Sequence, residues 1–344
     1  MIQNMRLHPF GMHQELTLEE LPSFSIIAGP NGSGKGAILW AAALPKYGLG
    51  FYDRFYTTGW RDLLSEKRTL AEIDWTFGPK QERLTFRLYS DGRGNIAART
   101  TNPLTGMVET SFRLSESPNA IADVSLGFPD EYTRRLFYGS GYRTTALEPF
   151  HFDPASRDIG RKGDGCLHAI LYLKKNDPQR LGWIETAIEE SHLRIPSLRS
   201  LPDTPDVDLI QSGQPEWFRE FESMAASESH LLALFAQGVL CEPGDTLLLD
   251  EPDGRLDPRR TRGLCAFLSR MANRKVQIVL TTLGTRMIDF IQPGIKGGSV
   301  PGDTTAFILA RESAVRTSLS RHRLADSSDA PSKLSRAIGE EPRT

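Results

Sequence analysis

Two short stretches of the chain combine residue types that act together on phosphates. The first, Gly29-Pro-Asn-Gly-Ser-Gly-Lys35, has the spacing of a phosphate-binding loop. Its glycines let backbone N–H groups turn toward phosphate oxygens, and its lysine reaches the outer phosphates of a nucleotide. A plain glycine turn before a helix is the simpler interpretation, but the lysine and the Asn-Gly pair favour phosphate binding.

One position of this loop departs from the usual pattern. A Ser or Thr normally follows the lysine and gives its hydroxyl to Mg²⁺, whereas Gly36 and Ala37 carry no hydroxyl. Because Mg²⁺ accepts water ligands readily, we expect phosphate binding to survive while metal affinity and turnover weaken. The expected nucleotide contacts are Gly29, Pro30, Asn31, Gly32, Ser33, Gly34, Lys35, Gly36 and Ala37.

The second stretch, TLLLDEPDGRLDP, begins with an apolar run that is followed by two acids, Asp250 and Glu251. A carboxylate at the end of a parallel strand can hold Mg²⁺, and its neighbour can polarise an attacking water. We therefore predict Lys35, Asp250 and Glu251 as catalytic residues, Asp250 also as the metal residue, and ATP and Mg²⁺ as cofactors. The alternative is a strand that ends in solvated acids.

The elements that must position these residues can be read from the apolar pattern. Residues 24–29, 246–250 and 276–282 are short apolar runs typical of buried strands, and residues 36–44 favour a helix. A helix is also predicted from 261 to 274, because Leu264, Phe267, Leu268 and Met271 fall on one face. Strands that alternate with helices indicate a mostly parallel sheet.

Other segments have different patterns. Residues 71–100 contain two alternating stretches that predict a hairpin or meander. From 116 to 204 the pattern favours helices over DEYTRRLFYG, CLHAILYLKKN and RLGWIETAIEES, with Asp177 as an N-cap and Pro178 at the first helical position. Residues 217–240 also favour a helix. Residues 311–344 are polar, and we expect a disordered tail there.

Composition excludes several classes of protein. The 344 residues include 41 Lys and Arg against 43 Asp and Glu, so the charge balance does not favour a sequence-independent DNA binder. Three scattered cysteines without a CxxC pair give no zinc or redox motif and suit a reducing cytoplasm. No apolar stretch is long enough for a membrane span, and the first residues lack the apolar run of a signal peptide. We expect a cytoplasmic protein without a membrane partner.

Together, the phosphate loop, LLLDEP and the LDP at 256–258 resemble the heads of ABC-type ATPases. The closer resemblance is to the soluble RecF/SMC/OLD-like group of AAA-family predicted ATPases. It covers roughly residues 1–310 and also includes four further stretches: the opening residues 1–36, FHFDPASRD with the segment 163–190, ESMAASESHLLALFAQGVL at 222–240, and VLTTLGTRMIDFI at 279–291.

This resemblance implies an α/β fold, that of a P-loop NTPase of the ABC head type, over residues 1–310. It implies a mostly parallel sheet, an N-terminal antiparallel β-subdomain and a helical middle segment at 116–204. It also implies a homodimer with ATP between the phosphate loop of one subunit and the signature helix of the other. Ser227, before that helix, and Asp257, in the LDP loop, would then contact the nucleotide or the partner subunit.

Three positions depart from the family pattern. The stretch Ala225-Ala226-Ser227-Glu228 lacks the signature glycine, and Glu228 would bring negative charge near the γ-phosphate. The family's switch histidine after Thr281-Thr282 is replaced by Leu283. With Gly36, these changes predict slow turnover or none, because a single transition-state contact is worth ~10²–10³ in rate.

Three functional hypotheses remain. The first is a slow ATPase that dimerises with ATP, and the second is a nucleotide-binding pseudoenzyme that serves as a scaffold or sensor for a partner effector. The third, the ATPase subunit of a membrane transporter, is disfavoured by the poor signature and the helical middle segment. A DNA-linked role in repair or anti-phage defence, with DNA and an effector such as a nuclease as partners, follows only from the resemblance.

Overall fold

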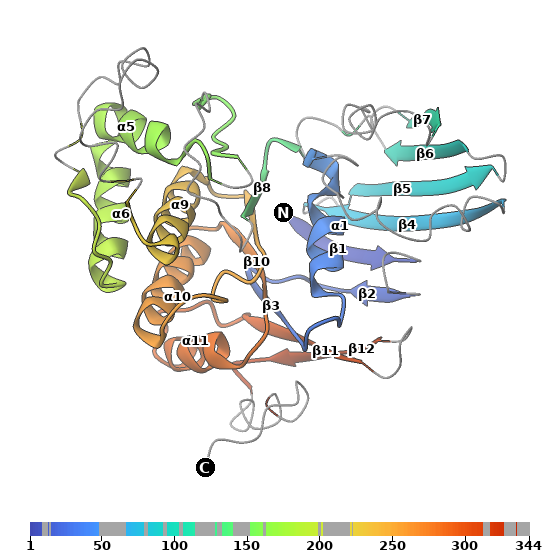
Figure 1. Cartoon of the computed structure of the whole chain (residues 1–344). Helices are drawn as coiled ribbons and strands as arrows, with labels where there is room; N and C mark the ends of the chain where they lie inside the picture. The colour runs from blue at the N-terminus through green and yellow to red at the C-terminus, as the bar shows by residue number, and fades with distance from the viewer. Residues whose placement is uncertain are drawn as a thin grey trace.

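The structure is a computed structural model. It describes residues 1–8, 13, 15–47, 67–78, 82–91, 95–102, 106–113, 128, 133–139, 152–160, 163–198, 201, 221, 223–311, 317–326 and 335. Two sheets dominate this part of the chain, and helices cover one of them (Figure 1).

The sheet that carries the candidate site has the strand order β12-β11-β3-β10-β9-β8. Its neighbours are parallel except for β12, which runs antiparallel to β11. The strands are β3 (Phe24–Ala28), β8 (Leu136–Gly139), β9 (Thr246–Leu249), β10 (Gln277–Thr282), β11 (Thr305–Arg311) and β12 (Thr317–Arg323). β3, β9 and β10 agree with the predicted strands to within a residue at each end.

Both faces of this sheet are apolar, which explains why its central strands read as continuous hydrophobic runs. In β3, Phe24 and Ile26 point into one core while Ile27 points into the other. In β9, Leu247 and Leu248 alternate between the same two cores. The sheet is therefore a layer between two apolar cores, and polar residues are expected mainly at the ends of its central strands.

Helices cover the two faces unequally. In Figure 1, α5, α6, α9, α10 and α11 lie together on one face, whereas α1 lies on the other, between the two sheets. The helices are α1 (Lys35–Tyr47), α5 (Cys166–Asn176), α6 (Pro178–Glu190), α9 (Ala226–Leu240), α10 (Pro258–Asn273) and α11 (Arg286–Lys296). The helix that follows the phosphate loop, α1, thus packs between the two sheets.

The second sheet is antiparallel and has the order β2-β1-β4-β5-β6-β7. Its strands are β1 (Ile2–Leu7), β2 (Leu16–Leu18), β4 (Lys67–Phe77), β5 (Glu82–Asp91), β6 (Asn95–Asn102) and β7 (Gly106–Arg113). One face packs on α1 through residues such as Trp75, whose ring nitrogen donates to the Ala41 carbonyl at 3.1 Å. This is the predicted antiparallel β-subdomain, longer by β6 and β7 than the two strands expected within 71–100.

A buried glutamine joins the two sheets. The side-chain oxygen of Gln277, on β10, accepts hydrogen bonds from the Ile2 backbone at 2.8 Å and from the Thr246 hydroxyl at 2.9 Å. Its amide nitrogen donates to the Ile2 carbonyl at 2.7 Å. Because a buried amide must satisfy its hydrogen bonds, this contact fixes the start of β1 against the parallel sheet.

The local helix predictions are confirmed where the structure describes the chain. The Asp177 side chain accepts from the Arg180 backbone N–H at 3.1 Å, and Pro178 begins α6. In α10, Leu264, Phe267 and Met271 are buried as the helical spacing predicts.

Two predictions about segments are wrong. Leu136–Gly139, part of the stretch expected to be helical, forms β8, a buried strand beside β9. Thr317–Arg323, within the expected disordered tail, forms β12 and pairs with β11 along its length. Residues 312–316, 327–334 and 336–344 of the tail, and residues 116–127, 129–132, 140–151, 161–162, 199–200 and 202–204 of the middle segment, lie outside the described residues, as do 217–220 and 222 of the helix predicted at 217–240.

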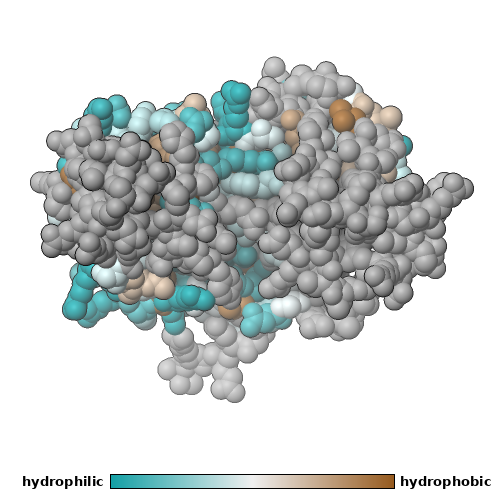
Figure 2. Space-filling model, turned by 45° about the horizontal axis from the view of Figure 1, so that its top comes forward, coloured by the Kyte–Doolittle hydropathy of each residue, from teal (hydrophilic) through white to brown (hydrophobic). Residues whose placement is uncertain are grey.

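The described residues on the face shown in Figure 2 are mainly polar. In the view of Figure 2 the coloured atoms are mostly hydrophilic, and the hydrophobic ones form small separate spots. Large hydrophobic side chains that are exposed include Met107 and Leu283. Within the described residues, no helix combines the length and the apolar character that a bilayer crossing requires.

Candidate functional site

The phosphate loop joins the carboxyl end of β3 to the start of α1 and is shaped by glycines. A side chain at Gly29 would put its Cβ 2.7 Å from the Ser33 hydroxyl and 2.8 Å from the Leu309 carbonyl. Gly32 and Gly34 have φ angles of 74° and 90°, a region that other residues rarely adopt. The loop is therefore a tight backbone cradle ahead of a helix N-terminus, a geometry suited to an anion.

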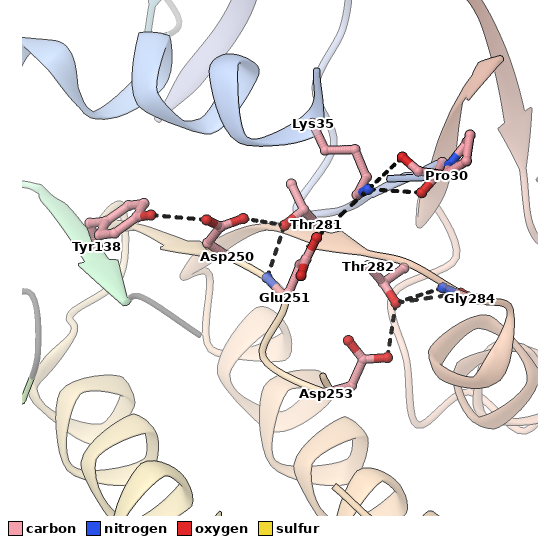
Figure 3. A network of polar contacts seen from close by, with 10 residues as sticks. Pro30, Lys35, Tyr138, Asp250, Glu251, Asp253, Thr281, Thr282 and Gly284 are labelled. Atoms are coloured by element: carbon pink, nitrogen blue, oxygen red, sulfur yellow. Dashed lines mark hydrogen bonds and ion pairs between the residues drawn. The ribbon is translucent and has the colours of Figure 1, made fainter. Parts of the chain in front are cut away.

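Lys35 is folded back onto this loop. Its Nζ donates to the carbonyls of Gly29 at 2.8 Å and Pro30 at 3.0 Å, and it lies 3.7 Å from Oε1 of Glu251 (Figure 3). Burial lowers the pKa of Lys35, and the carboxylates of Glu251 and Asp250 oppose that shift. The ammonium is thus held between carbonyls and an acid, where an incoming phosphate could take over its bonds.

Asp250 and Glu251 follow β9, and one hydroxyl orients both. Thr281, at the end of β10, donates to Oδ1 of Asp250 at 2.7 Å and accepts from the Glu251 backbone N–H at 2.9 Å (Figure 3). The register that pairs Leu280 with Leu249 brings these strand ends side by side. The predicted strand therefore delivers both acids to the phosphate loop.

Glu251 has a strained backbone and a perturbed side chain. Its φ of 45° lies in the left-handed region, which costs a residue with a side chain about 1 kcal/mol or more. Burial raises the pKa of Glu251, Lys35 lowers it, and Asp250 raises it further. A carboxylate with a raised pKa beside a phosphate cradle is a suitable base for an attacking water.

Asp253 connects the acidic segment to the loop after β10. Thr282 donates to Oδ2 of Asp253 at 2.9 Å, while Oδ1 is buried without a hydrogen bond. Burial raises the pKa of Asp253 and the Thr282 hydrogen bond opposes the shift. Leu283, at the switch position, is 37% exposed. A side chain there therefore faces solvent beside the site instead of filling the core.

Two residues that the sequence did not single out touch this region. The Tyr138 hydroxyl, on β8, donates to Oδ2 of Asp250 at 3.3 Å. His13 places Nε2 3.1 Å from the Gly34 carbonyl, and burial lowers the pKa of His13. Tyr138 was hidden in a stretch expected to be helical, and nothing in the spacing of His13 relates it to the loop.

Ser227 and Asp257 lie elsewhere, in what we call the α9–α10 corner: Ser227, Glu228, Asp257 and Arg260. Arg260 donates to the Ser227 hydroxyl at 2.6 Å and to Oε1 of Glu228 at 2.7 Å. Asp257 caps α10 by accepting from the backbone of Arg259 at 2.9 Å and of Arg260 at 3.1 Å. The hydrogen bonds of Asp257 and Ser227 thus stay within or beside the corner.

The Glu228 carboxylate is paired within the chain. Its side chain is only 8% exposed and lies 2.7 Å from Arg260, while its predicted approach to a γ-phosphate stays a prediction. The Arg194 backbone N–H also donates to it at 3.2 Å. The pairing partner is 32 residues away along the chain, so the local sequence gave no sign of it.

The comparison with solved structures agrees with this architecture. No protein-family model matches the sequence, and no curated protein matches it. The fold is similar to an Smc head bound to the C-winged helix domain of ScpA, with 15% identity, coverage of 94% of this chain and 98% of that chain, and a TM-score of 0.55.

A second similar structure is an Smc head domain with an extended coiled coil, bound to the C-terminal domain of ScpA derived from Pyrococcus furiosus. Its identity is 13%, the coverage is 97% of this chain and 99% of that chain, and the TM-score is 0.52. The chain therefore has the SMC-head type of α/β fold, with one antiparallel and one mostly parallel sheet, as expected for a P-loop ABC-type head.

Proposed function

We propose that this protein binds ATP with Mg²⁺ and hydrolyses it slowly. The observation that carries the proposal is the meeting of Lys35, Asp250 and Glu251 at the strand ends beside a glycine cradle. A solvated acidic strand end would not place its glutamate 3.7 Å from the lysine of a phosphate loop. The similarity in fold to Smc heads supports the same proposal.

The residues present fit both implied cofactors. The backbone of residues 29–36 and the ammonium of Lys35 would hold the phosphates, since a side chain at Gly29 would fill the cradle. Asp250 is an oxygen ligand of the kind that Mg²⁺ accepts alongside substrate phosphates and waters. When bound, Mg²⁺ neutralises charge on the phosphates. Glu251 would take the proton of the attacking water.

Two features of this chain support slow turnover. Lys35 must exchange its bonds to the carbonyls of Gly29 and Pro30 for bonds to phosphate. Leu283 offers no hydrogen bond to the γ-phosphate from the switch position. The exchange at Lys35 weakens ATP affinity, and the missing contact at Leu283 raises the barrier to hydrolysis.

We further propose that ATP joins two copies head to tail through the α9–α10 corner. Asp257 is exposed at the start of α10, and Arg260 uses only the oxygen of the Ser227 hydroxyl, which leaves its hydrogen for a phosphate oxygen. Light scattering of a Glu251→Gln variant, which should retain ATP, measures the assembly. A mass that stays the same with and without Mg-ATP contradicts the dimer.

Calorimetry and phosphate release test the proposed ATPase. We expect ATP to bind with Mg²⁺ and to be turned over faster than by a Lys35→Ala variant, which loses the phosphate contact. A Lys175→Ala variant, at the end of α5, serves as a matched lysine control and should behave like the native protein. Release by the native protein no faster than by Lys35→Ala rejects hydrolysis.

The second candidate is a nucleotide-binding pseudoenzyme that acts as a scaffold or sensor for an effector. It is favoured by the changes at Gly36 and Leu283 and by the engagement of Ser227 with Arg260. Tight ATP binding without release, together with release after Leu283→His and Gly36→Ser, would support it. Equal release by native and restored proteins would exclude it.

The cellular role is proposed from the resemblance alone. We propose a cytoplasmic protein with a DNA-linked role in repair or anti-phage defence, acting with an effector such as a nuclease. Fluorescence anisotropy with duplex DNA, with and without Mg-ATP, tests the DNA link. No change in anisotropy in either state would remove DNA from the proposal.

A further inference from the structure

The hydroxyl missing at position 36 has a counterpart beside Asp250. Tyr138, on β8, donates its hydroxyl to Oδ2 of Asp250 at 3.3 Å (Figure 3). Thr281 donates to the other oxygen, Oδ1, at 2.7 Å. Each oxygen of the candidate metal ligand is therefore held by one hydroxyl, and Tyr138 is the one that holds Oδ2.

The same oxygen is the one that a side chain at position 36 would approach. A Cβ built on Gly36 would lie 4.0 Å from Oδ2 of Asp250, at ordinary contact distance. A serine hydroxyl extends about 1.4 Å beyond its Cβ, so it could come within hydrogen-bonding reach of that oxygen. A side chain at position 36, on α1, and the hydroxyl of Tyr138, on β8, would thus both approach Oδ2 of Asp250.

Tyr138 is held firmly enough for such a role. It is only 4% exposed, and its backbone N–H donates to the Tyr47 hydroxyl at 3.2 Å. The two tyrosine rings meet edge to face with centroids 6.3 Å apart. The Tyr47 hydroxyl also donates to Asp158 at 3.1 Å. Tyr47 lies at the C-terminal end of α1, the helix that follows the phosphate loop. This end of α1 therefore holds Tyr138 in its orientation.

We propose that Tyr138 compensates for the missing hydroxyl at position 36 by positioning Asp250 for Mg²⁺. The inference rests on the proposed function, because it concerns the same nucleotide and metal site. Tyr138 is a positioning residue: its phenol keeps Oδ2 in place while Thr281 keeps Oδ1. The glycine in the phosphate loop is thereby compensated by a residue about 100 positions later in the chain.

The test is a double-mutant cycle on the Mg²⁺ dependence of ATP affinity. Calorimetry with Mg²⁺ and with EDTA compares the native protein, Tyr138→Phe, Gly36→Ser and the double variant. Tyr138→Phe should weaken ATP binding about 10-fold with Mg²⁺ and leave binding in EDTA unchanged, since lost second-shell contacts cost roughly 10–100-fold in metal affinity. Gly36→Ser should restore most of that loss in the Tyr138→Phe protein and change the native protein less than 3-fold.

Controls separate positioning from folding. Phenylalanine keeps the buried ring, and the melting temperature of each variant checks the fold. Tyr172→Phe, on α5 in the helical layer, is a matched tyrosine that should leave affinity unchanged with and without Mg²⁺. A loss in EDTA equal to the loss with Mg²⁺ would indicate a general structural role and overturn the inference.

The remaining outcomes distinguish the inference from the proposed function. Native protein that binds ATP with Mg²⁺ and is unaffected by Tyr138→Phe overturns the inference alone. Effects of Tyr138→Phe and Gly36→Ser that simply add also overturn it, because interchangeable hydroxyls must couple. Native protein that binds no ATP in either condition overturns the proposed function, and the inference with it.

Discussion

The phosphate-loop region and the α9–α10 corner place opposite charges together in different ways. Lys35 lies 3.7 Å from Glu251 and is otherwise held by two carbonyls, so its ion pair is loose. Arg260 lies 2.7 Å from Glu228 and also donates to Ser227, so its ion pair is close and buried on the carboxylate side. On the proposed function, the first arrangement keeps a cation ready for a ligand, whereas the second uses a cation to stabilise the fold.

This difference bears on the positions that differ from the pattern of the resembling family. The loop retains its cradle, and the change at Gly36 leaves space beside Asp250 without distorting it. The corner lacks the glycine that the resemblance implies and has a closed polar cluster in its place. We therefore expect substitutions in the first region to change turnover and those that break the Arg260–Glu228 pair to change stability.

Glu251→Gln should give the largest effect and tests the role of the phosphate-loop region. The amide keeps the shape of the side chain but cannot accept a proton, so turnover should fall about 10²–10⁴-fold. ATP affinity should change by less than about 3-fold, because Lys35 and the cradle remain. Single-turnover phosphate release and calorimetry measure the two quantities. Undiminished turnover would remove Glu251 from the mechanism.

Arg260→Ala tests the second region. Removing one partner of a buried pair leaves the Glu228 carboxylate uncompensated, which typically costs 3–5 kcal/mol; with Arg260 22% exposed we expect about 3 kcal/mol. Urea unfolding measures the loss. Arg259→Ala, its exposed neighbour, should cost less than about 0.5 kcal/mol, and adding Glu228→Gln to Arg260→Ala should recover much of the stability. A stable Arg260→Ala protein contradicts the comparison.

The sequence was informative where a structural feature depends on neighbouring residues. The loop at 29–35 between a strand and a helix, the Asp250-Glu251 pair at a strand end and the Asp177 cap each lie within one short stretch, and each has the predicted structure. β8 was mistaken for a helix because four buried residues, Leu136–Gly139, have too short a pattern to show a period of two.

Contacts between distant segments could not be predicted in this way. Tyr138 and Asp250 are 112 residues apart, and Arg260 and Glu228 are 32 apart. Their proximity follows from strand order and helix packing, which a single sequence does not specify. β12 was missed for a related reason: its residues are polar, and its strand form depends on pairing with β11.

Leu283→His should give a moderate effect that connects the two functional hypotheses. The position is 37% exposed, so we expect a change in stability below about 0.5 kcal/mol. A transition-state donor in an optimised site contributes ~10²–10³, and an added one should raise turnover roughly 10-fold. Phosphate release at saturating Mg-ATP measures the gain. Leu283→Gln is a polar control, and an equal gain from it would argue against a specific imidazole contact.

The smallest expected effect concerns His13 and pH. Burial lowers the pKa of His13, so the unfolded chain binds its proton more readily and stability falls as pH drops below the unfolded value near 6.5. Between pH 7 and pH 6 this loss is less than about 0.7 kcal/mol.

A His13→Gln variant keeps a donor for the Gly34 carbonyl and removes the titration. Its stability should therefore decrease less than that of the native protein over this range, by urea unfolding at both pH values. Equal decreases in the two proteins would show that His13 does not contribute to the pH dependence.

The pairing of β12 with β11 has a practical consequence for shortened versions of the chain. β12 covers the outer edge of β11 from Thr305 to Arg311, whose other edge faces β3. The polar composition after Arg311 suggests that the chain could be shortened there. Such a truncation would expose a row of unsatisfied N–H and C=O groups on β11. Such edges recruit strands from neighbouring molecules, so insolubility of that truncation would reflect intermolecular sheet growth rather than damage to the nucleotide pocket.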